Sequence, residues 1–227
     1  AVLIVFILLA AFPLWLHARA ADEYVAENVP MNISGVQCMV DFLIGGTASI
    51  WRVDNPAEPI EWTIPEALDY EGESYTVTRL GLSTSSSGAN ITALTLPDTL
   101  TDLGYTPFGV FSNVTELTIP GGVTVLNASF QNMKNLERLV ISEGVEEIAT
   151  GSMVNRCERL TEIILPDSLK RITGTATFRG ATALETIDLP EGVVIEEGST
   201  FSGCTSLKSV TLPASVSKIT SSMFEDC

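Results

Sequence analysis

The sequence predicts a right-handed solenoid in which short parallel β-strands stack turn upon turn, with a β-rich cap at the N-terminal end. One apolar phrase recurs six times between Ile91 and Cys227, and each copy contains a strand-like alternation. A fixed period of this size is typical of solenoids, because each repeat buries the apolar face of its neighbour. The copies open 22 to 24 residues apart, at Ile91, Val114, Leu136, Leu160, Leu184 and Leu207.

The first element expected in each copy is a short strand with one buried face. Apolar residues stand three and five positions after each opening, and proline follows in every copy except the third, which has Ser142. Such alternation is typical of a half-buried strand, and proline ends it because it cannot donate a ladder hydrogen bond. The buried pairs are Leu94 and Leu96, Leu117 and Ile119, Leu139 and Ile141, Ile163 and Leu165, Ile187 and Leu189, and Val210 and Leu212.

A second apolar pair follows each turn and predicts a short second strand or a helical turn. The fifth copy departs from the pattern, because Glu196 stands three residues after Val193, where an apolar residue is expected. An unpaired buried carboxylate is costly, so we expect a one-residue slip there instead of a buried glutamate. The regular pairs are Leu100 and Leu103, Val123 and Leu126, Val145 and Ile148, Leu169 and Ile172, and Val216 and Ile219.

Two further apolar slots close each copy and predict a continuous apolar rod, with turns stacked at roughly 4.7–4.9 Å. The first slot holds a large side chain: Phe108, Phe130, Met153, Phe178, Phe201 or Phe224. The last slot holds Phe111, Met133, Cys157, Ala181, Cys204 or Cys227.

Residues 21–89 are expected to form a β-rich N-terminal segment with a degenerate first turn. Ile64-Pro65 matches the end of a first strand, and Val77 and Leu80 match the second apolar pair. Val77 lies 12 residues after Pro65, against 3 in the regular copies, so this turn contains an insertion. Its closing slots hold Ser85 and Gly88, which cannot fill the interior as the other copies do.

The phrase resembles the leucine-rich repeat of BspA-like bacterial surface proteins, whose form is approximately L-x-x-I-x-I-P-x-x-V-x-x-I-x-x-x-x-F-x-x-C. Residues 207–227 follow this form almost throughout, and residues 160–181 follow it with alanine in place of the cysteine. Upstream, residues 47–51, 62–65 and 72–81 resemble the family's N-terminal segment. The resemblance covers roughly residues 45–227 and implies a leucine-rich-repeat solenoid, with six repeats over residues 90–227.

The net charge and the N-terminal residues indicate which partners are excluded and where the protein is located. A net charge of −16, from 12 basic and 28 acidic residues, argues against nucleic acid or an anionic membrane as partner. Residues 1–16 carry no charge, and Ala18-Arg-Ala20 resembles a cleavage site, so residues 1–20 predict a signal peptide. The run is short and contains Pro13, which disfavours a membrane anchor. We expect a secreted or cell-surface protein with no membrane insertion beyond the signal peptide.

The last copy ends at Cys227 without a polar capping turn, so we expect the array to be truncated at residue 227. Cys204 and Cys227 lie one turn apart, but parallel stacked side chains offer poor disulfide geometry. Cys157 and Cys204 are two turns apart, beyond the reach of a disulfide. Small buried apolar residues are therefore the favoured interpretation of these cysteines. Cys38 has no partner that the sequence identifies.

The residues needed for catalysis are scarce. The only histidine is His17, inside the predicted signal peptide, which removes Ser-His-Asp and Cys-His catalysis and most zinc sites. The pairs Glu146-Glu147 and Glu196-Glu197 occupy different positions of the repeat, and a solvated surface explains them. We expect no enzymatic activity, no cofactor and no metal.

Two other features allow a functional interpretation. Trp51 and Trp62 could form a sugar-stacking platform, but their place before the first regular turn favours apolar closure of the solenoid. Sequons occur at Asn32, Asn90, Asn113 and Asn127, and such short motifs arise readily by chance.

Function is expected on the outward face of the first strands. The central outward residues are Thr95, Thr118, Val140, Ile164, Asp188 and Thr211, and beside them stand Glu116, Arg138 and Glu162. Val140 and Ile164 form an apolar pair in adjacent turns, which is either a contact point or cross-strand packing.

These features predict a non-enzymatic, exported or cell-surface repeat protein that mediates protein–protein interaction. The BspA-like resemblance implies adhesion or binding to an extracellular or host protein, with a glycan as another possible partner. A carbohydrate-binding β-solenoid module is one alternative, although clustered acids and aromatics are missing from the strand face. An architectural spacer for a downstream domain is the other.

Overall fold

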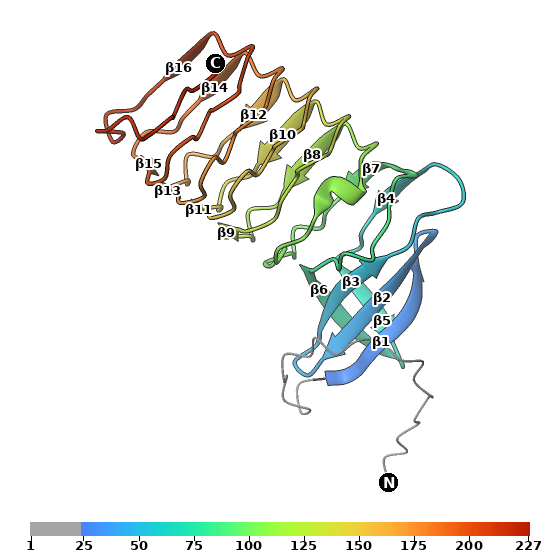
Figure 1. Ribbon diagram of the computed structural model, residues 1–227. Helices are drawn as coiled ribbons and strands as arrows, with labels where there is room; N and C mark the ends of the chain where they lie inside the picture. Colours follow the sequence, from blue (N-terminus) through green and yellow to red (C-terminus); the bar gives the residue numbers. More distant parts are fainter. Residues whose placement is uncertain (1–23) are drawn as a thin grey trace.

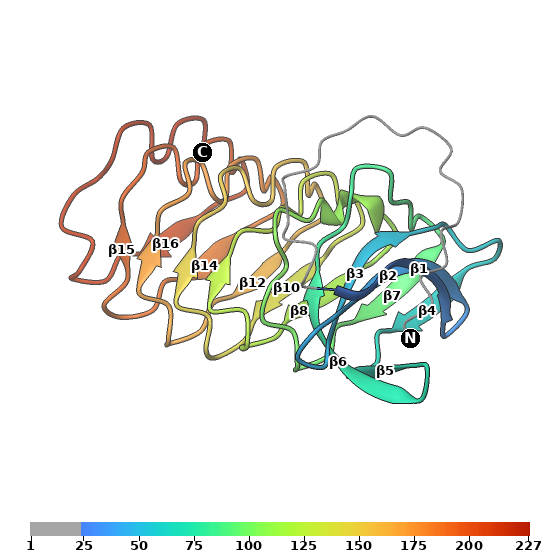
Figure 2. The same ribbon diagram turned by 90° about the horizontal axis from the view of Figure 1, so that it is seen from below.

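The computed structural model describes residues 24–227, so the predicted signal peptide and His17 lie outside the described residues. A five-stranded sheet lies at one end, and a solenoid runs from it to Cys227 (Figure 1). The turns follow one another in a single row, as the view in Figure 2 also shows. The strands of the five-stranded sheet are β1 (Tyr24–Ile33), β2 (Val36–Leu43), β3 (Thr47–Val53), β5 (Ala67–Tyr70) and β6 (Glu73–Leu80).

The five-stranded sheet has the order β1-β2-β3-β6-β5 and contains antiparallel hairpins and one parallel pair, β3 with β6. The β2–β3 hairpin turns at Gly45 and Gly46, whose φ angles of +103° and +78° suit glycine. The insertion after Pro65 forms β5 and the start of β6.

The degenerate turn stacks on the first regular copy. β4 (Ile60–Thr63) pairs in parallel with β7 (Ile91–Thr95), with Trp62 opposite Leu94. The amide of Leu80 donates to the carbonyl of Asp102 at 3.0 Å, which places the end of β6 against the second strand position of the first copy. Strand β6 therefore belongs to both the cap and the solenoid.

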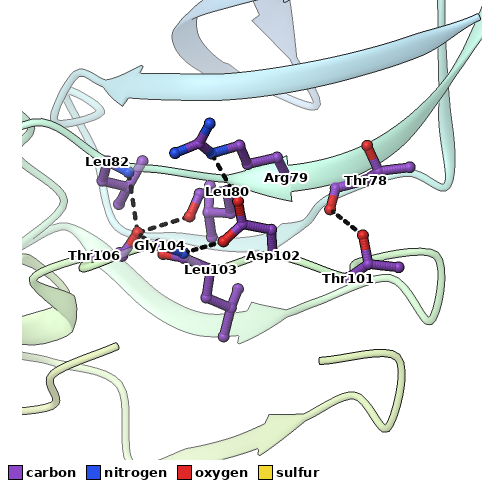
Figure 3. Close-up of polar contacts among 9 residues, drawn as sticks. All are labelled: Thr78, Arg79, Leu80, Leu82, Thr101, Asp102, Leu103, Gly104 and Thr106. Carbon is purple, nitrogen blue, oxygen red and sulfur yellow. Dashed lines mark hydrogen bonds and ion pairs between the residues drawn. The ribbon is translucent and has the colours of Figure 1, made fainter. Parts of the chain in front are cut away.

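A polar cluster holds this junction together (Figure 3). Thr106 is fully buried; its Oγ1 lies 2.6 Å from the carbonyl oxygen of Leu80 and accepts the amide of Leu82 at 3.0 Å. Beside it, Arg79 Nε lies 3.2 Å from Asp102 Oδ2 in an ion pair between the two turns.

Two rows of strands run along the solenoid (Figure 1). The first strands alternate buried and outward residues, and the two-residue second strands lie on another side of each turn. Corresponding residues of stacked turns face each other, as Leu117 faces Leu139 and Leu126 faces Ile148. The first strands are β7, β8 (Glu116–Ile119), β10 (Arg138–Ile141), β12 (Glu162–Ile164), β14 (Thr186–Asp188) and β16 (Ser209–Thr211). The second strands are β9 (Val125–Leu126), β11 (Glu147–Ile148), β13 (Arg171–Ile172) and β15 (Val194–Ile195).

The closing slots form the core column that the sequence predicts. Phe108 and Phe130 have ring centroids 5.1 Å apart, and Phe178 stacks on Phe201 at 5.5 Å with an interplanar angle of 17°. A single 3₁₀ turn, η1 (Phe108–Val110), occurs at the first of these slots. At the degenerate turn, Gly88 leaves the space that the Phe111 ring occupies: a Cβ there would lie 2.6 Å from the ring.

The cysteines of the last slot are free thiols that contact the preceding turn. Cys157 Sγ donates to the carbonyl of Phe130 at 3.1 Å, and Cys204 Sγ donates to that of Phe178 at 3.2 Å. Cys227 is exposed but makes the same contact with Phe201 at 3.1 Å. Each of these cysteines therefore links its turn to the previous one without a disulfide.

The one-residue slip in the fifth copy is confirmed. Ile195 pairs with Ile172 and is buried, whereas Glu196 is exposed. The ladder of first strands is interrupted at two places. The first strands form separate sheets, β4-β7, β8-β10-β12 and β14-β16, with no pairing between β7 and β8 or between β12 and β14.

Candidate functional site

The outward residues of the first strands form one face of the solenoid, which we call the strand face. Side chains of Thr95, Thr118, Asp188 and Thr211 are exposed on it. Val140 and Ile164 are half-buried and lie directly opposite each other in the β10–β12 register. The strand face thus has a small aliphatic centre between polar side chains.

A row of three charges runs beside the aliphatic pair. Arg138 faces Glu116 on one side and Glu162 on the other. Its Nε donates to Glu162 Oε2 at 2.7 Å, and both side chains remain about half accessible to solvent. Exposed pairs of this kind add little stability, so these charges remain free to interact with a partner at modest cost.

The breaks between the sheets divide the strand face. Residues from β8, β10 and β12 are brought together on one sheet, whereas Thr95 belongs to the sheet before it and Asp188 and Thr211 to the sheet after it. The predicted residues therefore share a face but not a continuous ladder.

The second strands carry a charge pattern that the sequence interpretation missed. Glu146 pairs with Lys170 at 2.8 Å, and Glu147 pairs with Arg171, which lies opposite it in the β11–β13 register. Glu146 is exposed and Glu147 is half-buried, and both carboxylates also link adjacent turns. The sequence did contain a sign of these ion pairs, because each basic residue stands 24 residues after its acidic partner, one repeat further along the chain.

Another acidic residue, Glu143, binds the backbone of the next turn. Its carboxylate accepts the amides of Asp167 at 2.8 Å and Ser168 at 3.1 Å. These backbone hydrogen bonds favour the charged form and lower the pKa of Glu143. The Glu143 carboxylate therefore joins two turns of the solenoid.

Two of the predicted sequons lie in an asparagine ladder. Asn113 Nδ2 donates to the carbonyl of Ala89 at 2.7 Å, and Asn90 Nδ2 donates to that of Pro56 at 2.8 Å. Asn135, one turn later, donates from Nδ2 to Asn113 Oδ1 at 3.0 Å. These amide nitrogens are the atoms that a glycan would modify, and here they hold neighbouring segments together.

Trp62 is buried at the degenerate turn, whereas Trp51 is not part of the core. Trp62 is 1% exposed, and its Nε1 donates to the carbonyl of Ile33 at 3.0 Å. Trp51 is half-buried, and its indole N–H has no hydrogen-bond partner in the part of the chain that the structure describes. A sugar-stacking platform needs an accessible ring face, and Trp62 offers none.

Within residues 24–227, no group of three or more histidine, cysteine, aspartate or glutamate side chains is placed to hold a metal ion. No helix in the same residues is long and apolar enough to span a membrane.

Comparison with known proteins matches the chain to the BspA type leucine rich repeat region, in six copies, over residues 74–181 and 127–227. A leucine-rich repeat protein from Bacteroides ovatus is 26% identical, with a TM-score of 0.51 over 87% of this chain. Another from Eubacterium ventriosum is 24% identical, with a TM-score of 0.50 over 85%. The chain spans 42% and 52% of those two proteins. No functionally curated protein matches the sequence.

Proposed function

Because the chain belongs to the BspA-type leucine-rich repeat family, we propose that it is an exported, non-catalytic repeat protein that binds a protein partner through the strand face. The observation that carries the proposal is the aliphatic pair of Val140 and Ile164 beside the charged row of Glu116, Arg138 and Glu162. An apolar centre with a polar surround is the usual anatomy of a protein–protein interface.

The architecture supports the same function. Stacked turns present side chains at fixed spacing over an extended surface, which is how repeat proteins bind macromolecules. The backbone beneath the strand face is held by strand pairing, so little ordering is needed on binding. Cell-surface location and adhesion follow from the resemblance to BspA-like proteins and are part of the proposal.

The test is a pull-down of the immobilised protein against purified extracellular-matrix proteins, run beside a glycan array. The diagnostic variant replaces Val140 and Ile164 with serine. The matched control replaces Val125 and Val194 with serine, because these valines are exposed apolar residues of the second strands, at 43% and 42%.

We expect a matrix protein to be captured, the Val140/Ile164 variant to lose that capture and the Val125/Val194 variant to keep it. Equal binding by all three proteins would rule out the strand face. Capture of glycans alone, lost when Trp51 and Trp62 are replaced, would establish the carbohydrate-binding alternative. Capture of nothing would favour an architectural spacer.

A further inference from the structure

The fourth and fifth copies stack on two sides and separate on the third. Their second strands pair, with Val194 N donating to the carbonyl of Lys170 at 2.9 Å. Beyond the second strands, Ala176 N donates to the carbonyl of Gly198 at 3.0 Å. On the strand face, however, β12 and β14 belong to different sheets.

The backbone hydrogen bonds that are missing between the fourth and fifth copies can be identified by comparing equivalent positions of the repeat. The residue after each opening donates its amide to the previous turn in the regular copies, as Thr161 N does to the carbonyl of Glu137 at 3.0 Å. Glu185 holds this position in the fifth copy, and its amide has no partner in the described chain. Backbone groups left without a protein partner must be satisfied by water or a ligand.

The core beneath this break is slightly less covered than in the regular third copy. Ile163 is 6% exposed and Leu189 is 9% exposed, whereas Leu139 is 0% and Ile141 is 1%. All four side chains are still buried.

The connection that follows β14 is also one residue shorter than that of the fourth copy. Val194 follows Pro190 by four residues, whereas Arg171 follows Pro166 by five. Strand β15 nevertheless keeps its register with β13. The break between β7 and β8 lies beside connections of regular length, so a short connection is not required for a break.

The separation opens a groove of about 320 Å³, which we call the seam groove. Its aliphatic walls lie beside two carboxylates, Glu162 and Asp188, and no basic residue lines it. Glu162 gives one oxygen to Arg138, whereas Asp188 is exposed and has no hydrogen-bond or ion-pair partner in residues 24–227. The lining residues are Thr161, Glu162, Ile163, Ile164, Leu165, Thr186, Ile187 and Asp188.

We propose that the seam groove binds an arginine side chain of the protein partner. The aliphatic stem of arginine fits the walls formed by Ile164 and Leu165, and its guanidinium supplies donors to the Asp188 carboxylate. The chain's net charge of −16 favours the approach of a basic partner. This inference rests on the proposed function, because the groove adjoins the Val140–Ile164 pair and would engage the same partner.

The probe is a short glycine- and serine-flanked peptide with one central arginine, compared with the same peptide carrying citrulline. Binding is followed by amide chemical shifts of the ¹⁵N-labelled protein. We expect shifts at residues 161–165 and 186–188 with the arginine peptide only. Asp188→Asn should weaken binding about tenfold, because a charged hydrogen bond is lost. Glu196→Gln, an equal change of charge elsewhere in the same copy, should leave the affinity unchanged.

Equal shifts with the citrulline peptide, shifts spread over the acidic surface, or unchanged binding by Asp188→Asn would each overturn the proposal. A circular dichroism spectrum checks that Asp188→Asn is folded. The titration needs no partner, so its failure beside a successful pull-down would reject the arginine site and leave the strand-face proposal standing. Failure of the pull-down with a successful titration would reject the proposed function and leave the arginine site.

Discussion

At the scale of single residues, the cysteine of the repeat phrase does more than fill space. Three cysteines, Cys157, Cys204 and Cys227, each donate to a phenylalanine carbonyl one turn earlier. An alanine in the same slot, as at Ala181, keeps the volume small but loses the donor. Each of these carbonyls also accepts a backbone amide of its own turn, so the thiol adds a second hydrogen bond, and this one joins two turns.

Alkaline pH should destabilise the protein through these thiols. Burial raises the pKa of Cys157 to about 12 and that of Cys204 to about 11, above the ordinary value of 9.0. The folded protein thus favours the protonated thiol, so this stability is complete below about pH 9 and is lost as pH rises to 11–12. Denaturant titrations at pH 8 and pH 10.5 should show a smaller loss in the Cys157→Ala/Cys204→Ala variant than in the parent. An equal loss in both proteins would contradict this role.

A second recurring position of the repeat adopts a left-handed backbone conformation. The position before the last slot has positive φ in five copies, at Asn132, Arg156, Gly180, Gly203 and Asp226. Arginine has φ of +63° there, a conformation that costs a residue with a Cβ roughly 1–2 kcal/mol.

Arg156→Gly should therefore raise the free energy of unfolding by about 1 kcal/mol, after the greater entropy of glycine in the unfolded chain is included. The reverse test is Gly203→Ala, at φ +73°, where a Cβ meets nothing closer than 3.8 Å. The free energy of unfolding of that variant should be about 1 kcal/mol lower, through backbone strain alone. Urea unfolding measures both, and a destabilised Arg156→Gly would show that the arginine side chain outweighs the strain.

At the scale of the strand and turn, the apolar slots carry the stability of each copy. Phe178 is fully buried and stacks on Phe201, whereas Thr118 is exposed on the strand face. Phe178→Ala should lower the free energy of unfolding by roughly 3–5 kcal/mol, because it removes buried apolar area and leaves a cavity. Thr118→Ala should change stability by less than about 0.5 kcal/mol. Similar losses in the two variants, measured by urea unfolding, would invalidate the assignment of buried and outward positions.

The periodic residues were predictable from the sequence because packing alone selects them. Alternation identified the buried face of β8, β10, β12 and β14, and the displaced Glu196 revealed the slip in the fifth copy. The break beside β14 was not predictable from β14 itself, because Ile187 and Leu189 look as regular as Leu139 and Ile141.

The site was predicted less completely than the fold. Exposure of the strand-face residues followed from alternation, which has a period of two. The seam groove arises from a spacing between two strands, and no residue type marks such a spacing. The ion pairs of Glu146 and Glu147 could have been found by comparing charges one repeat apart.

At the scale of the whole molecule, the solenoid is a row of turns joined by unequal contacts. Amide hydrogen exchange should report this directly at one repeat position. Thr115 and Glu185 have unpaired amides there, whereas Glu137 N and Thr161 N donate to the previous turn at 2.7 and 3.0 Å. We expect the first two amides to exchange at least about tenfold faster than the last two. Equal protection at all four would show that the strands close in solution.

The break between β7 and β8 has a mechanical consequence. In the described chain, the backbone hydrogen bonds between these two turns are Phe108 N to Ser129 O at 2.8 Å and Ser129 N to Thr106 O at 3.1 Å. Tension along the solenoid axis loads every junction in series, and the junction with the fewest bonds yields first. A protein pulled by its two ends would therefore part between its first and second copies before the other turns unwind, so the copies from β8 onward would separate as one unit from the cap and the first copy.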